Sequence, residues 1–299
     1  MIATSDRTDL TADAAPAVRA FFDDATFTVT YLVTDPATGR AAIVDPTLDF
    51  DAKSGRTSTR SADAVVEAAR AAGVTVEWIL ETHVHADHLT AAPRLRAATG
   101  AKVGIGARIV DVQRTFKPIF GASDLATDGT QFDRLFGDGD RFALGTMPVE
   151  VMATPGHTPA CVTYRIGDAM FVGDTLFMPD FGTARTDFPG GDAATLYRSI
   201  HRILAQPPAT RIFVGHDYKA PGRDRYAWET TVAEERAHNI HVRDGIGEAD
   251  FVRMRTERDA KLAMPTLILP AIQVNIRAGN FPPPDADGQV YLKLPVDRL

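Results

Sequence analysis

The sequence of 299 residues contains a single cysteine, Cys161. No disulfide can therefore form within the chain, and a zinc finger built from several cysteines is excluded. Because reducing compartments disfavour disulfides, this cysteine usage favours a cytoplasmic location. Cys161 begins an apolar stretch, where we expect a buried structural thiol.

The sequence also lacks long hydrophobic runs and an excess of basic residues. No apolar segment approaches the ~20 residues that span a bilayer, and residues 1–16 lack the basic and apolar regions of a secretory signal. We therefore expect no membrane association. With 32 basic and 39 acidic residues, the net charge is −7. Nucleic-acid binding needs a clustered basic surface, so nucleic acid is not an expected partner.

Short apolar strands alternate with helical patterns along the chain, which is typical of an α/β protein. Residues 47–60 are polar and are predicted to form a loop, and the segment from Leu267 onward is predicted to be irregular. Ser61 is the expected N-cap of the first helix, and Gly73 its end. The patterns predict strands at 27–34, 41–44, 76–80, 102–105, 149–153, 162–166, 169–172 and 211–214, and helices at 61–72, 91–99, 193–204 and 230–241.

Three histidines and an aspartate lie within six residues, His83 to His88. In an extended segment the side chains at i and i+2 point the same way, so His83 and His85 can bind one ion together. A bend after Ala86 can turn Asp87 and His88 toward a second position. Imidazole nitrogens and carboxylates suit zinc or iron. This cluster therefore predicts a metal site.

Three further polar residues each follow a predicted apolar strand. His157 lies in the turn Thr154-Pro155-Gly156-His157-Thr158, Asp174 follows Gly173, and His216 follows Gly215. Each of these residues by itself is typical of a structural turn. Because loops at one edge of a sheet gather a site, we expect these residues to join the histidine cluster.

The order of these seven residues resembles the ligand series of the metallo-β-lactamase superfamily, over roughly residues 20–240. The resemblance implies an αββα sandwich, with two mixed β-sheets flanked by helices and the site at one edge. The expected organisation is an N-terminal tail at 1–20, a metallo-β-lactamase domain at 21–240 and a C-terminal extension at 241–299 packed on the same domain.

Finer stretches resemble the persulfide dioxygenases, also called sulfur dioxygenases. They include residues 82–90, 185–188, 216–218 and 275–279. The segments 178–185 and 219–224 are most similar to the bacterial β-lactamase-like hydrolase (Blh) branch of that group. The longer loop at 178–184 departs from the mitochondrial type and bears on how the substrate binds.

The resemblance implies one Fe(II) per chain, bound by His83, His157 and Asp174. The implied reaction oxidises glutathione persulfide with O₂ and water to sulfite and glutathione. The remaining four residues of the series would orient the ligands and tune the iron, or hold a second metal ion: His85, Asp87, His88 and His216.

The same residues allow two alternatives. Two zinc ions bridged by Asp174 could hold a hydroxide that attacks a thioester such as S-lactoylglutathione, as in glyoxalase II. A non-catalytic metal-binding or thiol-binding module is disfavoured, because the ligand set is complete. A homodimer is expected only because homodimers are common among enzymes.

Three residues, one in the loop after Gly182 and two beside His216, are candidates for substrate binding. Arg185 could bind a glutathione carboxylate, or it could pair with Asp187. Tyr218 and Lys219 come directly after His216, so their hydroxyl and ammonium groups could hold the peptide and a carboxylate of the substrate.

Overall fold

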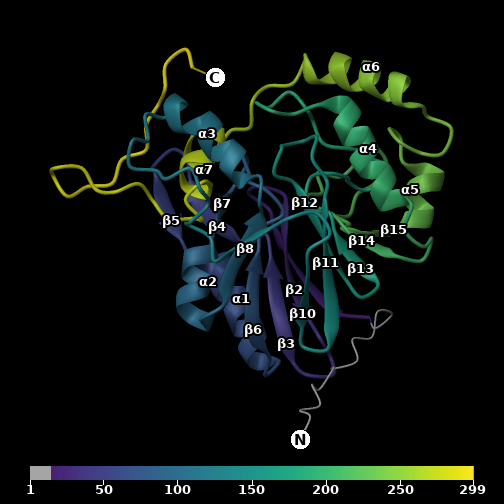
Figure 1. The fold of residues 1–299 in the computed structure, drawn as a ribbon, viewed down its shortest axis with the longest axis horizontal. Coiled ribbons are helices and arrows are strands. Elements are labelled where there is room, and N and C mark those ends of the chain that lie inside the picture. Colours follow the sequence, from purple (N-terminus) through teal and green to yellow (C-terminus); the bar gives the residue numbers. More distant parts are fainter. Residues whose placement is uncertain (1–14, 299) are drawn as a thin grey trace, which may run out of the picture.

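Two six-stranded sheets face each other in the computed structural model, which describes residues 15–298 (Figure 1). Both sheets mix parallel and antiparallel neighbours. The first sheet has the order β1 (Ala17–Asp23), β2 (Thr28–Thr34), β3 (Arg40–Val44), β6 (Thr75–Leu80), β8 (Lys102–Gly106) and β9 (Arg134–Phe136). The second has the order β10 (Arg141–Leu144), β11 (Met147–Ala153), β12 (Val162–Ile166), β13 (Ala169–Phe171), β14 (Arg211–Phe213) and β15 (Glu229–Thr231).

Alternating side chains on these strands make the layer between the sheets. Val29 and Tyr31 of β2 point inward and pack with Val149 and Val151 of β11. Burial of such side chains is worth about 1.5–3 kcal/mol each, so this layer supplies much of the force that holds the sheets together. The Tyr31 hydroxyl donates to the Val214 carbonyl at 2.5 Å, which joins the two sheets near the site.

Helices cover the outer face of each sheet, as the αββα prediction requires. On the first sheet lie α1 (Arg60–Ala71), α2 (Ala92–Thr99) and α3 (Ile109–Ile119). On the second lie α4 (Ala193–Leu204) and α5 (Val232–His238), and α6 (Glu248–Asp259) packs against α4. Leu196, Ile200 and Ile203 form the helical-period stripe that buries α4, and Asp192 caps this helix by accepting from the Thr195 amide.

The predicted loop at 47–60 is wrong, because β4 (Thr47–Asp51) and β5 (Arg56–Ser58) form a hairpin there, and β4 also pairs with β7 (Leu89–Thr90). Side-chain hydrogen bonds stabilise this polar hairpin. Asp49 accepts from the amide and the hydroxyl of Ser61, at 3.1 and 2.8 Å. Ser61 is therefore not the N-cap of α1. That position belongs to Thr59.

Both ends of the chain also contain elements that the sequence patterns did not predict. The segment from Leu267 contains a buried helix, α7 (Ile268–Asn275), with Pro270 in its first turn, where proline is tolerated. Residues 17–20, expected to belong to a tail, are part of β1 and pair with β2. Residues 1–14 of that predicted tail lie outside the described residues.

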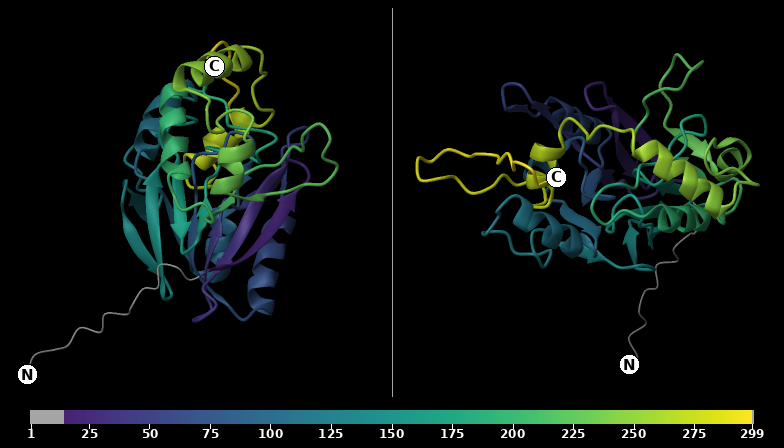
Figure 2. Two further views of the ribbon diagram at one scale, coloured as in Figure 1. Left: turned by 90° about the vertical axis from the view of Figure 1, so that its right-hand side faces the viewer. Right: turned by 90° about the horizontal axis from the view of Figure 1, so that it is seen from above.

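Helices α6 and α7 lie at the same end of the sandwich (Figures 1 and 2). The loops that follow β6, β11, β13 and β14 carry the predicted ligands. No helix within residues 15–298 has the length and apolar composition needed to cross a bilayer.

Gly156, just before His157, lets α4 approach the turn closely. Its φ is +137°, and a Cβ there would lie 2.4 Å from the Leu196 backbone. We expect Gly156→Ala to destabilise the fold by roughly 2–5 kcal/mol, through backbone strain and overpacking. The control Gly73→Ala meets nothing within 4 Å at φ +65° and should cost about 1–2 kcal/mol from strain alone. Urea unfolding of the metal-free proteins measures both, and equal losses would contradict this account.

Candidate metal centre

All seven predicted ligand residues come together at one end of the sandwich. Six of them are at most 8% exposed, and Asp87 is partly exposed. His83, His157 and Asp174 form one group, whose ligand atoms all lie within 4.8 Å of one another. The Nε2 atoms of both histidines are 3.8 Å from the same Asp174 oxygen, Oδ2.

A second group lies next to the first and shares Asp174. The Nε2 atom of His216 is 3.1 Å from Asp87 Oδ2 and 3.2 Å from Asp174 Oδ1. His88 forms a further group with His85 and Asp87. Burial and the neighbouring His85 lower the pKa of His88 to about 4, so its imidazole is neutral and able to bind a metal.

The chemistry of these atoms fits a metal ion. Several are buried and have no hydrogen-bond partner in the described structure, which costs free energy unless another group binds them. Imidazole nitrogens and carboxylate oxygens are suitable ligands for zinc and iron. The atoms without partners include Nε2 of His83, His88 and His216, Oδ2 of Asp87 and Oδ1 of Asp174. We conclude that this histidine and aspartate cluster is a metal-binding site.

Hydrogen bonds to the opposite ring nitrogens orient two of the ligands. The Thr82 hydroxyl donates to Asp45 Oδ2 at 2.8 Å, so its lone pair is free to accept from His83 Nδ1 at 3.0 Å. His157 Nδ1 donates to the Arg185 carbonyl at 2.8 Å. Both bonds leave Nε2 deprotonated and directed at the metal position. Asp45 was not predicted, although its place directly after β3 matches the pattern of the other site residues.

His85 faces two buried carboxylates and is not part of the group formed by His83, His157 and Asp174. Its Nε2 atom lies 3.1 Å from Asp45 Oδ1 and 3.6 Å from Glu81 Oε2. Burial by itself would lower the pKa of His85, but these carboxylates raise it to about 9. Burial raises the pKa of Glu81 to about 8. Neither carboxylate was singled out from the sequence.

A side chain from α7 holds the loop of the histidine motif. Asn275 donates from Nδ2 to the carbonyls of His85 and His88, both at 2.8 Å, and accepts from the Thr90 amide at 2.9 Å. Every hydrogen-bonding position that this buried amide uses is therefore directed at the motif. The C-terminal segment thus takes part in building the site.

A cavity of about 560 Å³ opens over the cluster. Asp87, His157 and Asp174 contribute to its lining, as do Arg185 and Tyr218. Five aromatic side chains also line it: Phe27, Phe50, Phe177, Phe181 and Phe188. This combination of apolar walls and a few polar groups is typical of a small-molecule site.

The three predicted substrate-binding residues differ in their placement. Tyr218 stacks on the ring of His216, with centroids 5.6 Å apart. Arg185 makes the ion pair with Asp187 that was one of its two alternatives, through two contacts of 2.6 Å. Lys219 is not among the lining residues of the cavity, and its Nζ atom lies 4.4 Å from the centroid of the Tyr226 ring.

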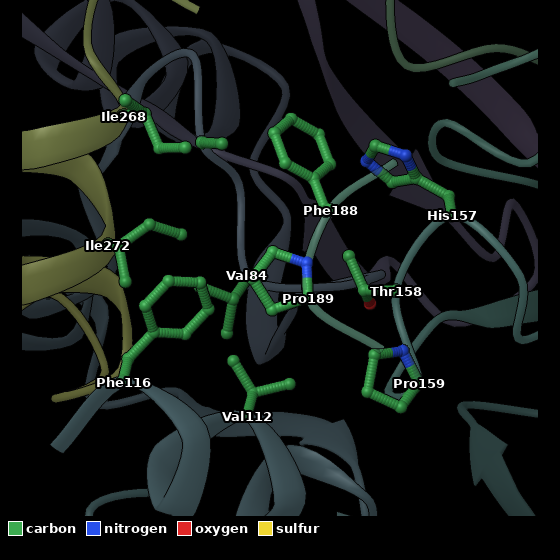
Figure 3. Close-up of a pocket in the computed structure, with 11 residues that line it drawn as sticks. Val84, Val112, Phe116, His157, Thr158, Pro159, Phe188, Pro189, Ile268 and Ile272 are labelled. Atoms are coloured by element: carbon green, nitrogen blue, oxygen red, sulfur yellow. The ribbon is translucent and has the colours of Figure 1, made fainter. Parts of the chain in front are cut away.

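A second, smaller cavity of about 20 Å³ also contacts His157 (Figure 3). Val112 and Phe116 of α3 and Ile268 and Ile272 of α7 contribute to its apolar lining. Helices α3 and α7 thus pack an apolar layer against this side of His157. Cys161 is buried nearby, where it accepts from the Thr158 amide at 3.3 Å, and burial raises its pKa to about 12.

Comparison with known proteins shows similarity over most of the chain. A family model described as the Metallo-beta-lactamase superfamily matches residues 23–216. A probable metallo-hydrolase of Burkholderia pseudomallei is 52% identical, over 94% of this chain and 99% of its own length. A beta-lactamase hydrolase-like protein of Agrobacterium fabrum is 54% identical over 96% of this chain, which spans 66% of that relative.

More distant similarity extends to a different named activity. The mitochondrial persulfide dioxygenase ETHE1 of Mus musculus is 31% identical, over 91% of this chain and 93% of its own length. The crystal structure of ETHE1 from Myxococcus xanthus superimposes with a TM-score of 0.69 at 32% identity, covering 88% of this chain and 100% of that one.

Replacing Asn275 by aspartate tests whether its hydrogen bonds fix the loop of the histidine motif. The carboxylate would have the same shape as the amide but could not donate to the two carbonyls, so we expect metal affinity to fall by roughly 10–100-fold. Chelator competition measures this affinity. The matched control is Gln273→Glu on the same helix, where the amide bonds Leu269 and Lys293 instead. Equal loss of affinity in both variants would contradict a specific role for Asn275.

Proposed function

This chain belongs to the metallo-beta-lactamase superfamily, and we propose that it is an Fe(II)-dependent persulfide dioxygenase of the Blh branch. The proposed reaction oxidises glutathione persulfide with O₂ and water to sulfite and glutathione. Both atoms of O₂ and one oxygen from water end on the terminal sulfur, and its bond to the glutathione sulfur breaks. The 31% identity to a named persulfide dioxygenase supports this choice.

The observation that carries the proposal is the separation of His85 from the first ligand group. His83, His157 and Asp174 form a set of two histidines and one carboxylate, while His85 faces Asp45 and Glu81. Such a set holds a ferrous ion and leaves coordination positions open. A bound ferrous ion would supply the electron-transfer chemistry with O₂ that side chains lack.

The surrounding residues would fix the ligands and shape the reaction space. The Asp45–Thr82 pair and the Arg185 carbonyl hold His83 and His157 in their metal-binding tautomers. The aromatic walls of the larger cavity exclude water and accommodate the organic part of a substrate. Tyr218 lines this cavity against His216 and is proposed to contact the substrate.

A zinc thioester hydrolase of the glyoxalase II type is the second candidate. The observation that favours it is the adjacent group of Asp87, Asp174 and His216, which could hold another ion with Asp174 as the bridge. Two bridged zinc ions can generate a hydroxide that attacks a thioester carbonyl. The name of the Burkholderia relative, a probable metallo-hydrolase, is in line with this alternative.

Oxygen consumption by anaerobically iron-reconstituted protein tests the proposal. With glutathione persulfide we expect rapid O₂ uptake and sulfite formation. His157→Ala should lower both by more than about 100-fold, because it removes a metal ligand. The control His201→Ala removes an exposed imidazole on α4 whose one hydrogen bond within residues 15–298 is to the Tyr197 carbonyl, and it should remain active.

The zinc-loaded protein, tested with S-lactoylglutathione, provides the parallel assay. Brisk thioester cleavage without any O₂ uptake by the iron-loaded protein would overturn the dioxygenase and establish the hydrolase.

A further inference from the structure

Three arginines line the larger cavity, and two of them are already paired. Arg185 binds Asp187 through two contacts, and Arg255 binds Asp259 and the Thr183 carbonyl. The third, Arg258, makes no ion pair and no side-chain hydrogen bond with any residue between 15 and 298. Its guanidinium is thus available to a ligand of the cavity.

Arg258 lies in the last turn of α6, outside the part of the chain that the superfamily model matches, residues 23–216. The chain continues from α6 along the cavity, where residues 262, 263 and 265–267 also contribute to the lining. This wall therefore comes from a segment that does not supply any metal ligand. It can determine which substrates bind without altering the metal centre.

The charges around the cavity leave one cation without compensation. Asp187 and Asp259, which are not lining residues, neutralise Arg185 and Arg255. The two acidic residues of the lining, Asp87 and Asp174, belong to the metal cluster. Arg258 is therefore an excess positive charge on the α6 wall. Its planar fork of N–H donors matches a carboxylate, which it can bind through two parallel hydrogen bonds.

We propose that Arg258 binds a carboxylate of the substrate's organic part, so that the cavity selects a persulfide carried by an acidic thiol peptide. This inference rests on the proposed dioxygenase function for the identity of the reacting sulfur. The cavity volume of about 560 Å³ supports it, because sites of about 300–1,000 Å³ accommodate ligands of drug or peptide size. Inorganic hydrogen persulfide would leave such a cavity mostly empty.

Steady-state kinetics of iron-loaded variants test the assignment. Arg258→Ala should raise the KM for glutathione persulfide by roughly 10–100-fold, the usual effect of losing a hydrogen-bonded charge pair. The kcat should be unchanged, because the contact is the same in the ground and transition states. Arg258→Lys should recover part of the affinity. Arg253→Ala is the control, since Arg253 lies on the same helix, pairs with Asp250 and does not line the cavity.

Substrates that lack one carboxylate sharpen the test. One is the persulfide of glutathione esterified at glycine, and the other lacks the α-carboxylate of the γ-glutamyl residue. With the wild-type protein, one of these two substrates should show a KM raised as much as Arg258→Ala raises the KM for glutathione persulfide. With Arg258→Ala, the same substrate should show no further increase in KM. The assignment is overturned if each modification of the substrate raises KM equally in the wild type and in Arg258→Ala. It is also overturned if Arg258→Ala leaves the KM for glutathione persulfide unchanged.

Binding without turnover separates this inference from the proposed reaction. Calorimetry with zinc-loaded protein and glutathione itself should show weaker binding to Arg258→Ala than to Arg253→Ala. If no variant oxidises any persulfide, the dioxygenase proposal fails. The calorimetric difference then still decides whether Arg258 binds a carboxylate, and equal affinities would overturn it.

Discussion

The structure depends on holding several buried nitrogen and oxygen atoms close together without letting them satisfy one another. Nε2 of His83, His88 and His216 and single oxygens of Asp87 and Asp174 remain unpartnered in the described structure. Side chains free to rotate would form hydrogen bonds and lose the metal geometry, so the neighbouring groups must fix them. Thr82 with Asp45, the Arg185 carbonyl and the Asn275 amide do this for different parts of the cluster.

The residues that form and support the site come from two parts of the chain, the core at 23–216 that the superfamily model matches and the C-terminal segment after it. The core at 23–216 supplies all seven residues of the predicted ligand series, from loops that follow strands of both sheets. The segment beyond it contributes α6 and α7. Asn275 of α7 bonds the histidine loop, 190 residues away from His85 in the sequence. Arg255 of α6 donates to the Thr183 carbonyl, in the loop at 178–184 that lines the cavity. The C-terminal segment therefore serves both the metal centre, through Asn275, and the wall of the cavity, through α6 and the residues after it.

The sequence predicted those features whose cause is local. Helix α4 and the ligands that follow apolar strands were predicted, because strand periodicity and turn residues lie close together in the chain. The αββα sandwich was predicted from the resemblance of the ligand series to the superfamily. The β4–β5 hairpin and α7 were not, since side-chain hydrogen bonds and contacts with distant residues stabilise them. Asn275 carries no local motif, and Asp45 and Glu81, which follow strands as the predicted ligands do, were not singled out. Lys219 was selected for its position beside His216, which does not fix where its side chain points.

The location of bound iron tests the central claim most directly. A crystal structure of the anaerobically iron-loaded protein, with the iron found by its anomalous scattering, would resolve each site. The account predicts one iron per chain, bound by His83, His157 and Asp174, with His85 still beside Asp45. Two ions bridged by Asp174, with His85 turned away from Asp45 to become a ligand, would contradict it.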